Sequence, residues 1–125
     1  MQESGENYLK AVFLLQQKHP QVHLTEVARY LNVTKASTSR AMKVLEKDGY
    51  IIHQSYKAIE LTDKGRSAAA DIIERFDYLT TFLHEVLQVD YEVAVKDACR
   101  IEHDISEQTL GKLIEYLHRC RTLDT

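Results

Sequence analysis

The chain has 125 residues, of which 44% are hydrophobic, a composition typical of a globular protein with one domain or two small domains sharing a core. No apolar run approaches the roughly 20 residues that a membrane-spanning helix needs, and the N-terminal residues have neither the basic start nor the apolar core of a signal peptide. We therefore expect a cytoplasmic protein. Cys99 and Cys120 lie too far apart for a zinc-knuckle or thiol redox motif, so both are expected to be reduced thiols.

The formal net charge of −3 is distributed unevenly along the chain. Residues 25–66 carry eight Lys or Arg against five Asp or Glu, whereas residues 67–125 carry six against twelve. A basic segment in an acidic chain indicates a local site for a polyanion, because Lys and Arg gain affinity by releasing counterions from phosphates. The alternative is an ordinary solvated surface of mixed charge, and charge alone does not decide between the two.

The first half of the chain is predicted to form three helices followed by two short strands. Ser4 is the expected N-cap of the first helix, Asn32 tolerates the left-handed conformation of a tight turn, and Thr34 can cap the third helix. Gly49 is expected to end that helix before the strands begin. The predicted helices cover 4–18, 25–31 and 35–48, and the predicted strands cover 50–53 and 58–61.

The second half is predicted to be entirely helical. Thr62 can cap a long helix over 63–87, and Asp90 and Ser106 are the expected caps of two further helices. Apolar residues of the long helix alternate four and three apart and form a seam suited to another helix: Ile72, Phe76, Leu79, Leu83 and Val86. With the apolar face of the first helix, this seam predicts an isologous homodimer, unless both faces are covered within one subunit.

Two helices joined by a three-residue turn and followed by a strand pair have the order of a winged helix-turn-helix, whose second helix enters the major groove of DNA. Residues near the N-terminus of that helix reach base edges, and Arg40 can read a guanine there. The wing loop is expected to lie along the phosphate backbone or the minor groove. The predicted DNA contacts are Thr34, Lys35, Ala36, Ser37, Thr38, Ser39, Arg40, Lys43, Lys47, Tyr56 and Lys57. The alternatives are solvated helix surface with a packing hairpin, or a module for protein contacts.

Cys99, Glu102 and His103 occupy positions i, i+3 and i+4 of a predicted helix and therefore share one of its faces. A thiolate, a carboxylate and an imidazole in this arrangement suit a transition metal better than magnesium or calcium. The alternative is that Cys99 packs in the core while the other two residues cap or pair locally. Spacing by itself favours that alternative.

Several segments resemble a known family: ENYLKAVFLL, LTEVARYLNVTKASTSRAMKVLEKDGYI, LTDKGR and DACRIEHDIS. They are similar to the diphtheria toxin repressor family of metal-dependent regulators, in particular its short manganese-regulator branch, which lacks the extra C-terminal domain. The resemblance covers nearly the whole chain, and DACRIEH is far more specific than a generic helix-turn-helix. It implies a mainly α fold with a small β wing: a winged helix-turn-helix DNA-binding domain over 1–66 and an α-helical dimerisation and metal-binding domain over 67–125. It also implies a homodimer that a divalent metal orders for operator DNA.

The resemblance also identifies departures from the family's metal ligands. Asn7 stands where the family supplies Met or Asp, Lys10 where manganese-type members carry Glu, and Phe76 where they carry His. An ammonium group opposes a nearby cation, so the second of the family's two metal sites is expected to be lost. Thr80 and Val95 also replace polar residues of an ancillary site. The predicted metal ligands are Cys99, Glu102 and His103, with Asn7 as a weak fourth.

The leading hypothesis is a metal-dependent repressor of metal-homeostasis genes, with manganese or iron(II) as its cofactor and zinc or cobalt as further candidates. The alternative is a winged-helix regulator with a degenerate metal site and no bound metal, which either acts independently of metal or responds to oxidation of Cys99. An enzyme is the third class, because Cys99 and His103 place a thiol and an imidazole one turn apart. The chain offers neither a Gly-rich phosphate loop nor a recognisable pair of catalytic carboxylates, so catalysis is not expected.

Overall fold

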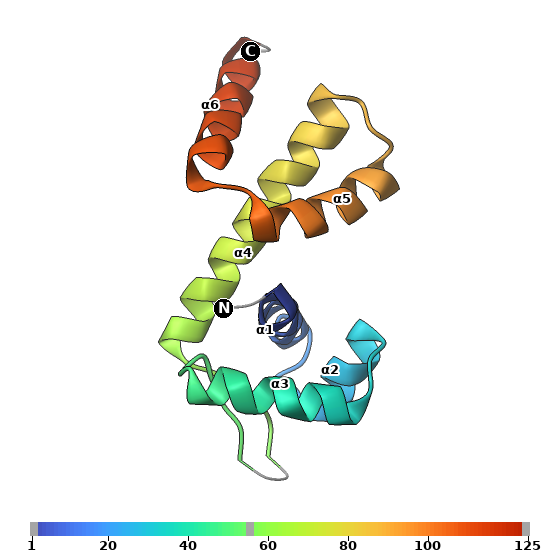
Figure 1. Cartoon of the computed structure of the whole chain (residues 1–125), viewed down its shortest axis with the longest axis vertical. Helices are drawn as coiled ribbons and strands as arrows, with labels where there is room; N and C mark the ends of the chain where they lie inside the picture. The colour runs from blue at the N-terminus through green and yellow to red at the C-terminus, as the bar shows by residue number, and fades with distance from the viewer. Residues whose placement is uncertain (1–2, 55–56, 124–125) are drawn as a thin grey trace. The chain divides into compact units, whose positions relative to one another are not determined.

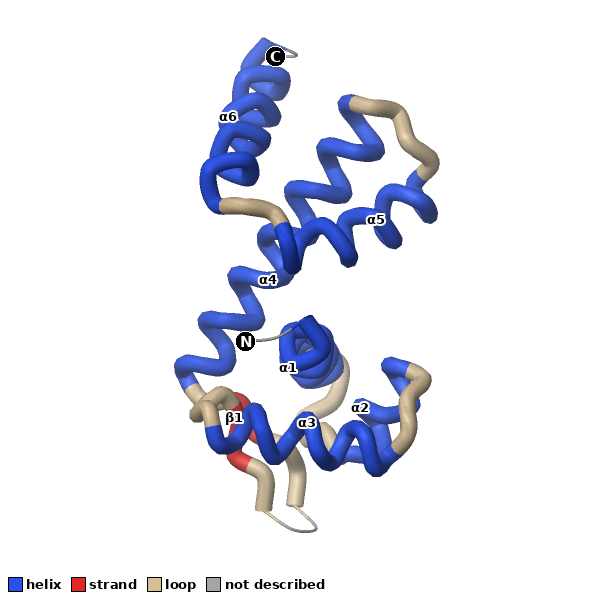
Figure 2. Tube along the Cα trace, viewed as in Figure 1, coloured by secondary structure: helices blue, strands red, loops and turns tan. Residues whose placement is uncertain are grey.

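The computed structural model describes residues 3–54 and 57–123, and within them helices predominate over a single pair of short strands (Figure 2). Backbone contacts divide the chain into two compact units, 1–72 and 73–125. No helix among the described residues is long and apolar enough to cross a membrane. The elements are α1 (Glu3–Gln16), α2 (Leu24–Leu31), α3 (Lys35–Lys47), β1 (Ile51–Ile52), β2 (Glu60–Leu61), α4 (Asp63–Thr81), the π-helical turn η1 (Phe82–Val86), α5 (Tyr91–Asp104) and α6 (Glu107–Leu123).

Local signals fix the turn between α2 and α3. Asn32 ends α2 in the left-handed conformation, with φ of 56°, and Thr34 is the N-cap of α3, where its Oγ1 accepts the N–H of Ser37 at 3.1 Å. Both predictions are confirmed. The prediction for Ser4 is wrong, because α1 begins at Glu3 and Ser4 therefore lies inside the helix. Spacing in a sequence locates a helix end only to within one or two residues.

The core of unit 1 forms where α1 packs on α2 and α3 and the strand pair closes the other side (Figure 1). In the antiparallel pair, Ile51 faces Leu61 and both are buried, whereas their neighbours Ile52 and Glu60 are exposed. This alternation orients the wing without exposing its apolar side. The fully buried apolar side chains include Leu9, Val12, Val22, Val27, Met42, Leu45, Ile51 and Ile59.

Thr62 connects the end of α3 to the beginning of α4. Its hydroxyl donates to the carbonyl oxygen of Gly49 at 2.6 Å and accepts the N–H of Gly65 at 3.0 Å. Gly49 adopts a φ of +87°, which a glycine tolerates at little cost. The predicted capping role of Thr62 is confirmed, and the same side chain holds the root of the wing in place.

Unit 2 consists of the second half of α4 together with η1, α5 and α6. Its buried centre contains Leu79, Ala98 and Leu110, and partly buried apolar residues surround it: Phe76, Leu83, Ile101, Ile105, Leu113 and Ile114. Much of the predicted seam of the long helix is therefore covered within one subunit, so the seam does not by itself argue for a dimer. This corrects the basis of the dimer prediction, because an apolar pattern shows that a face is buried but not which partner buries it.

The helix ends of unit 2 follow the predictions only in part. Ser106 caps α6, since its Oγ accepts the N–H of Thr109 at 3.1 Å. Asp90 occupies the N-cap position of α5, but within the described residues its side chain makes no capping hydrogen bond. The long helix ends as α-helix at Thr81, and a π-helical turn replaces the last turn predicted for it.

Candidate DNA surface and metal site

The outer face of α3 carries most of the predicted DNA contacts. Ser37 and Ser39 are half-buried, and a larger set of side chains is exposed to solvent: Thr34, Lys35, Ala36, Arg40, Lys43 and Lys47. The exposed set combines small side chains, which permit close approach to DNA, with cations spaced along one helix. The structure thus brings the predicted basic residues together on the second helix of a helix-turn-helix.

Thr38 does not belong to this surface, although the sequence placed it there. Its side chain is completely buried, and its hydroxyl donates to the carbonyl oxygen of Thr34 at 2.9 Å. A buried hydroxyl that bonds to the preceding turn stabilises the start of the helix and offers nothing to DNA. Thr38 is therefore left out of the candidate surface, and a helix-facing position accounts for its burial.

The wing is anchored to α3 by a contact that the sequence did not suggest. Oε2 of Glu46 accepts the backbone N–H of His53 at 2.8 Å. An acidic residue in a basic helix is the only local hint of this role, and the seven-residue separation depends on the geometry of the turn between them. Lys57 is exposed beside the wing loop, whereas the predicted contact Tyr56 lies outside the described residues.

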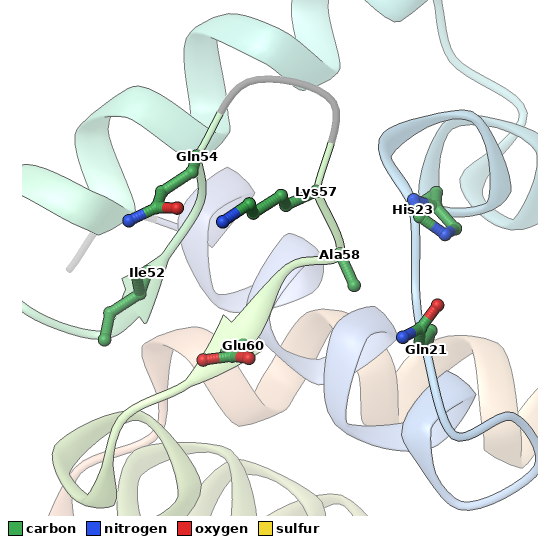
Figure 3. Close-up of a pocket in the computed structure, with 7 residues that line it drawn as sticks. All are labelled: Gln21, His23, Ile52, Gln54, Lys57, Ala58 and Glu60. Carbon is green, nitrogen blue, oxygen red and sulfur yellow. The ribbon is translucent and has the colours of Figure 1, made fainter.

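A pocket of about 380 Å³ lies beside the wing. Gln54 and Lys57 come from the two limbs of the hairpin, and Gln21 and His23 come from the loop between α1 and α2 (Figure 3). Its lining residues are Gln21, His23, Ile52, Gln54, Lys57, Ala58 and Glu60. Because Lys57 and Glu60 bring opposite charges, the pocket selects no particular charge on a ligand.

The three principal metal candidates meet on α5. One ligand atom from each of Cys99, Glu102 and His103 lies within 4.8 Å of the others. A tetrahedral metal with bonds of about 2.0–2.3 Å separates its ligand atoms by roughly 3.3–3.8 Å, so small side-chain adjustments would bring all three onto one ion. The sulfur, oxygen and nitrogen donors suit a divalent transition metal. The residues present therefore fit the kind of ion that their spacing predicts.

Burial distinguishes this group from an ordinary surface cluster. Glu102 is 2% exposed, and the side chain of His103 is 2% exposed, whereas Cys99 is half-buried. Carboxylates are rarely buried without a compensating partner, so burial of Glu102 marks a position where a cation would be stabilised. Asn7 lies on α1 in unit 1, and its role as a fourth ligand stays a prediction.

The departures from the expected ligand pattern have structural counterparts. Phe76 packs against the Leu79, Ala98 and Leu110 cluster, so an apolar contact occupies its place on α4. Among the residues that the structure describes, the Cys99 group is the one cluster of three metal-binding side chains. Both cysteines are free thiols, as predicted, and a hydrogen bond with Cys120 raises the pKa of the Tyr116 phenol above its ordinary value.

Comparison with known protein families agrees with the two halves of this arrangement. Residues 1–59 match the model "Iron dependent repressor, N-terminal DNA binding domain", and residues 62–123 match "Iron dependent repressor, metal binding and dimerisation domain". The chain is 30% identical over 122 residues to an HTH-type transcriptional regulator of Methanocaldococcus jannaschii, covering 97% of this chain and 98% of that one. It is 28% identical over 116 residues to the HTH-type transcriptional regulator MntR of Bacillus subtilis, covering 90% and 81%.

Solved structures share the fold. A manganese-dependent transcriptional repressor in complex with manganese superposes with a TM-score of 0.83 at 26% identity, over 91% of this chain and 52% of that one. The metal-dependent transcriptional regulator MtsR gives a TM-score of 0.85 at 24% identity, over 91% and 53%. The chain thus spans about half the length of these two solved chains. The chain belongs to the iron-dependent repressor family, which is the diphtheria toxin repressor family of metal-dependent transcription regulators.

Proposed function

We propose that this protein is a homodimeric, sequence-specific transcription repressor whose affinity for operator DNA rises when a divalent transition metal binds Cys99, Glu102 and His103. The observation that carries the proposal is the convergence of those three donors within 4.8 Å, with Glu102 buried, in a chain of this family. Residues 1–66 would bind DNA, and residues 67–125 would bind metal and dimerise. The cytoplasm, where such DNA is reached, is the proposed location, and transcription control rather than catalysis is the proposed role.

The DNA-binding step follows from the face of α3. Lys43 and Lys47 are exposed one turn apart and match phosphates, while Arg40 lies nearer the helix N-terminus, where side chains reach bases. Lys57 extends this positive surface to the wing. Phosphate contacts from several cations supply affinity for any duplex, and contacts with base edges add preference for one sequence.

The metal-binding step follows from the chemistry of the α5 donors. Manganese and iron(II) are the first candidates, and zinc and cobalt also accept a set of sulfur, nitrogen and oxygen ligands. The ion would supply positive charge beside the buried carboxylate of Glu102 and connect it to Cys99 and His103. These three side chains would hold the ion and fix the rotamers that line this face of α5.

Exposed apolar side chains at the junction of η1 and α5 are the proposed contact with a second copy. Leu87, Tyr91 and Val93 are 55%, 59% and 47% exposed, and all three lie within seven residues of sequence. Apolar side chains gathered in this way favour a protein contact, and a two-fold arrangement would present two recognition helices to a palindromic operator. The seam of α4 is no longer needed for this argument.

A DNA titration at fixed salt tests the proposal, using genomic fragments with chelator and then with manganese, iron(II), zinc or cobalt. The expected result is that one metal tightens binding at least about tenfold, equivalent to roughly 1.4 kcal/mol of coupling. Equal affinity with chelator and with every metal would overturn metal control and leave a regulator that is constitutive or responds to Cys99 oxidation. Peroxide treatment of wild type and Cys99→Ser separates those two cases. Failure to bind any fragment would overturn the proposal as a whole.

A further inference from the structure

We propose that Ser37 is a positioning residue that holds the guanidinium of Arg40 at the start of the recognition helix and presents its own hydroxyl proton to an acceptor on DNA. The inference rests on the proposed DNA-binding function and deepens it, since it names how one base-reading side chain is oriented. The three residues involved, Thr34, Ser37 and Arg40, lie three apart along the first turns of α3 (Figure 1).

Hydrogen bonds connect these three side chains in sequence. The Thr34 hydroxyl donates to Oγ of Ser37 at 2.9 Å, and Nη2 of Arg40 donates to the same Oγ at 3.4 Å. The backbone N–H of Ser37 separately donates to Oγ1 of Thr34 at 3.1 Å. Ser37 thus receives one hydrogen bond from each side, and the cap of the helix uses only its backbone.

The capacity of a serine hydroxyl determines what Ser37 has left to offer. A hydroxyl oxygen accepts two hydrogen bonds and donates one. With both acceptor positions directed to Thr34 and Arg40, the remaining capacity of Ser37 is its own O–H. At the N-terminal end of α3, this donor suits an acceptor such as a phosphate oxygen, or N7 or O6 of guanine.

The same contact restricts Arg40. The residue is exposed, and a free arginine side chain loses up to about 2 kcal/mol of rotamer entropy when it is immobilised. A hydrogen bond to Ser37 in the unbound protein removes part of that loss before DNA arrives, so more of the binding free energy is realised on contact. The remaining guanidinium N–H groups stay available for a bidentate contact with guanine.

A double-mutant cycle tests the inference. The probes are a duplex selected from a random library by the wild-type protein, the same duplex with each guanine replaced singly, and an unselected duplex. In one salt, Ser37→Ala is expected to weaken binding to the selected duplex about tenfold when Arg40 is present, but less than about twofold in an Arg40→Ala background. Ser37→Thr, which keeps the hydroxyl, should restore the discrimination between guanine and its replacements.

Ser39→Ala is the matched control, because it removes a half-buried hydroxyl from the same helix without touching this chain of hydrogen bonds. Ser37→Ala retains the backbone N–H that Thr34 accepts, so the helix cap persists, and thermal unfolding checks that the variants are equally folded. Additive losses in the cycle, or an equal loss on the unselected duplex, would overturn the inference while leaving the proposed function intact. A wild-type protein that selects no duplex would overturn both.

Discussion

Oε1 of Glu102 lies 3.6 Å from Nε2 of His103, and the exposed fractions of the two side chains are 0% and 2%. Neighbouring residues of a helix normally point about 100° apart, so their convergence in a buried place reflects a shared environment and not helix geometry alone. Cys99 joins them from the preceding turn. A carboxylate, an imidazole and a thiol so close together form a site that a cation would complete.

Replacement of the carboxylate should uncouple the protein from metal. Glu102→Gln keeps the size of the side chain but removes its negative charge, so the dissociation constant for the preferred metal should rise at least about tenfold. In the wild type, metal at 100 times its dissociation constant adds about 2.7 kcal/mol to the free energy of unfolding. Thermal unfolding with and without metal measures both effects.

The matched control for that experiment is Glu107→Gln, which changes an exposed carboxylate in the first turn of α6. It should leave the metal-dependent rise in unfolding temperature unchanged. A Glu102→Gln protein that keeps the full rise would show that metal binds elsewhere. The control also accounts for the loss of one negative charge from an acidic unit.

Salt dependence should separate phosphate contacts from other surface cations. For Lys43→Ala, the slope of log affinity against log salt is expected to fall by about one relative to wild type, on any duplex. Lys112→Ala is the control, because Lys112 is 72% exposed on α6 and lies 3.7 Å from Glu115. Fluorescence anisotropy at several salt concentrations measures the slopes, and an unchanged slope for Lys43→Ala would remove that residue from the DNA contact.

Much of unit 1 could be predicted from the sequence because its signals are local. A left-handed Asn32, a capping Thr34 and a Thr62 at the start of α4 each depend on a few neighbouring residues. Burial of Thr38 could not be predicted in this way, since a hydroxyl residue within a serine-rich turn gives no sign of the direction it faces. The tie between Glu46 and His53 depends on how the chain turns between them.

The metal group shows the same division between local and tertiary information. Spacing placed Cys99, Glu102 and His103 on one helical face, and the structure brings their ligand atoms together. It could not indicate that Glu102 is buried, because carboxylates are usually exposed. The apolar seam of α4 was recognised as a buried face, but the sequence did not show that α5 and α6 of the same chain cover it.

Two glycine substitutions should have opposite effects on stability. A Cβ at Gly65 would overlap the carbonyl oxygen of Tyr50, so Gly65→Ala should lower the free energy of unfolding by more than about 2 kcal/mol. Gly111 lies in α6 with open space around it, and Gly111→Ala should raise that free energy by about 0.5–1 kcal/mol. Urea unfolding followed by circular dichroism measures both, and a neutral Gly65→Ala would contradict the close packing of α4 against the end of α3.

Charge introduced into the apolar surface at the start of α5 should weaken the dimer. Leu87→Glu places a carboxylate among exposed apolar side chains that include Tyr91, and two such groups would face each other across a two-fold contact. We expect the dimer dissociation constant, measured by analytical ultracentrifugation, to rise at least about tenfold. Val44→Glu is the control, since Val44 is 58% exposed on α3, where the change should weaken DNA binding and leave the mass unchanged. A Leu87→Glu protein with wild-type mass at all concentrations would place the dimer contact elsewhere on the subunit.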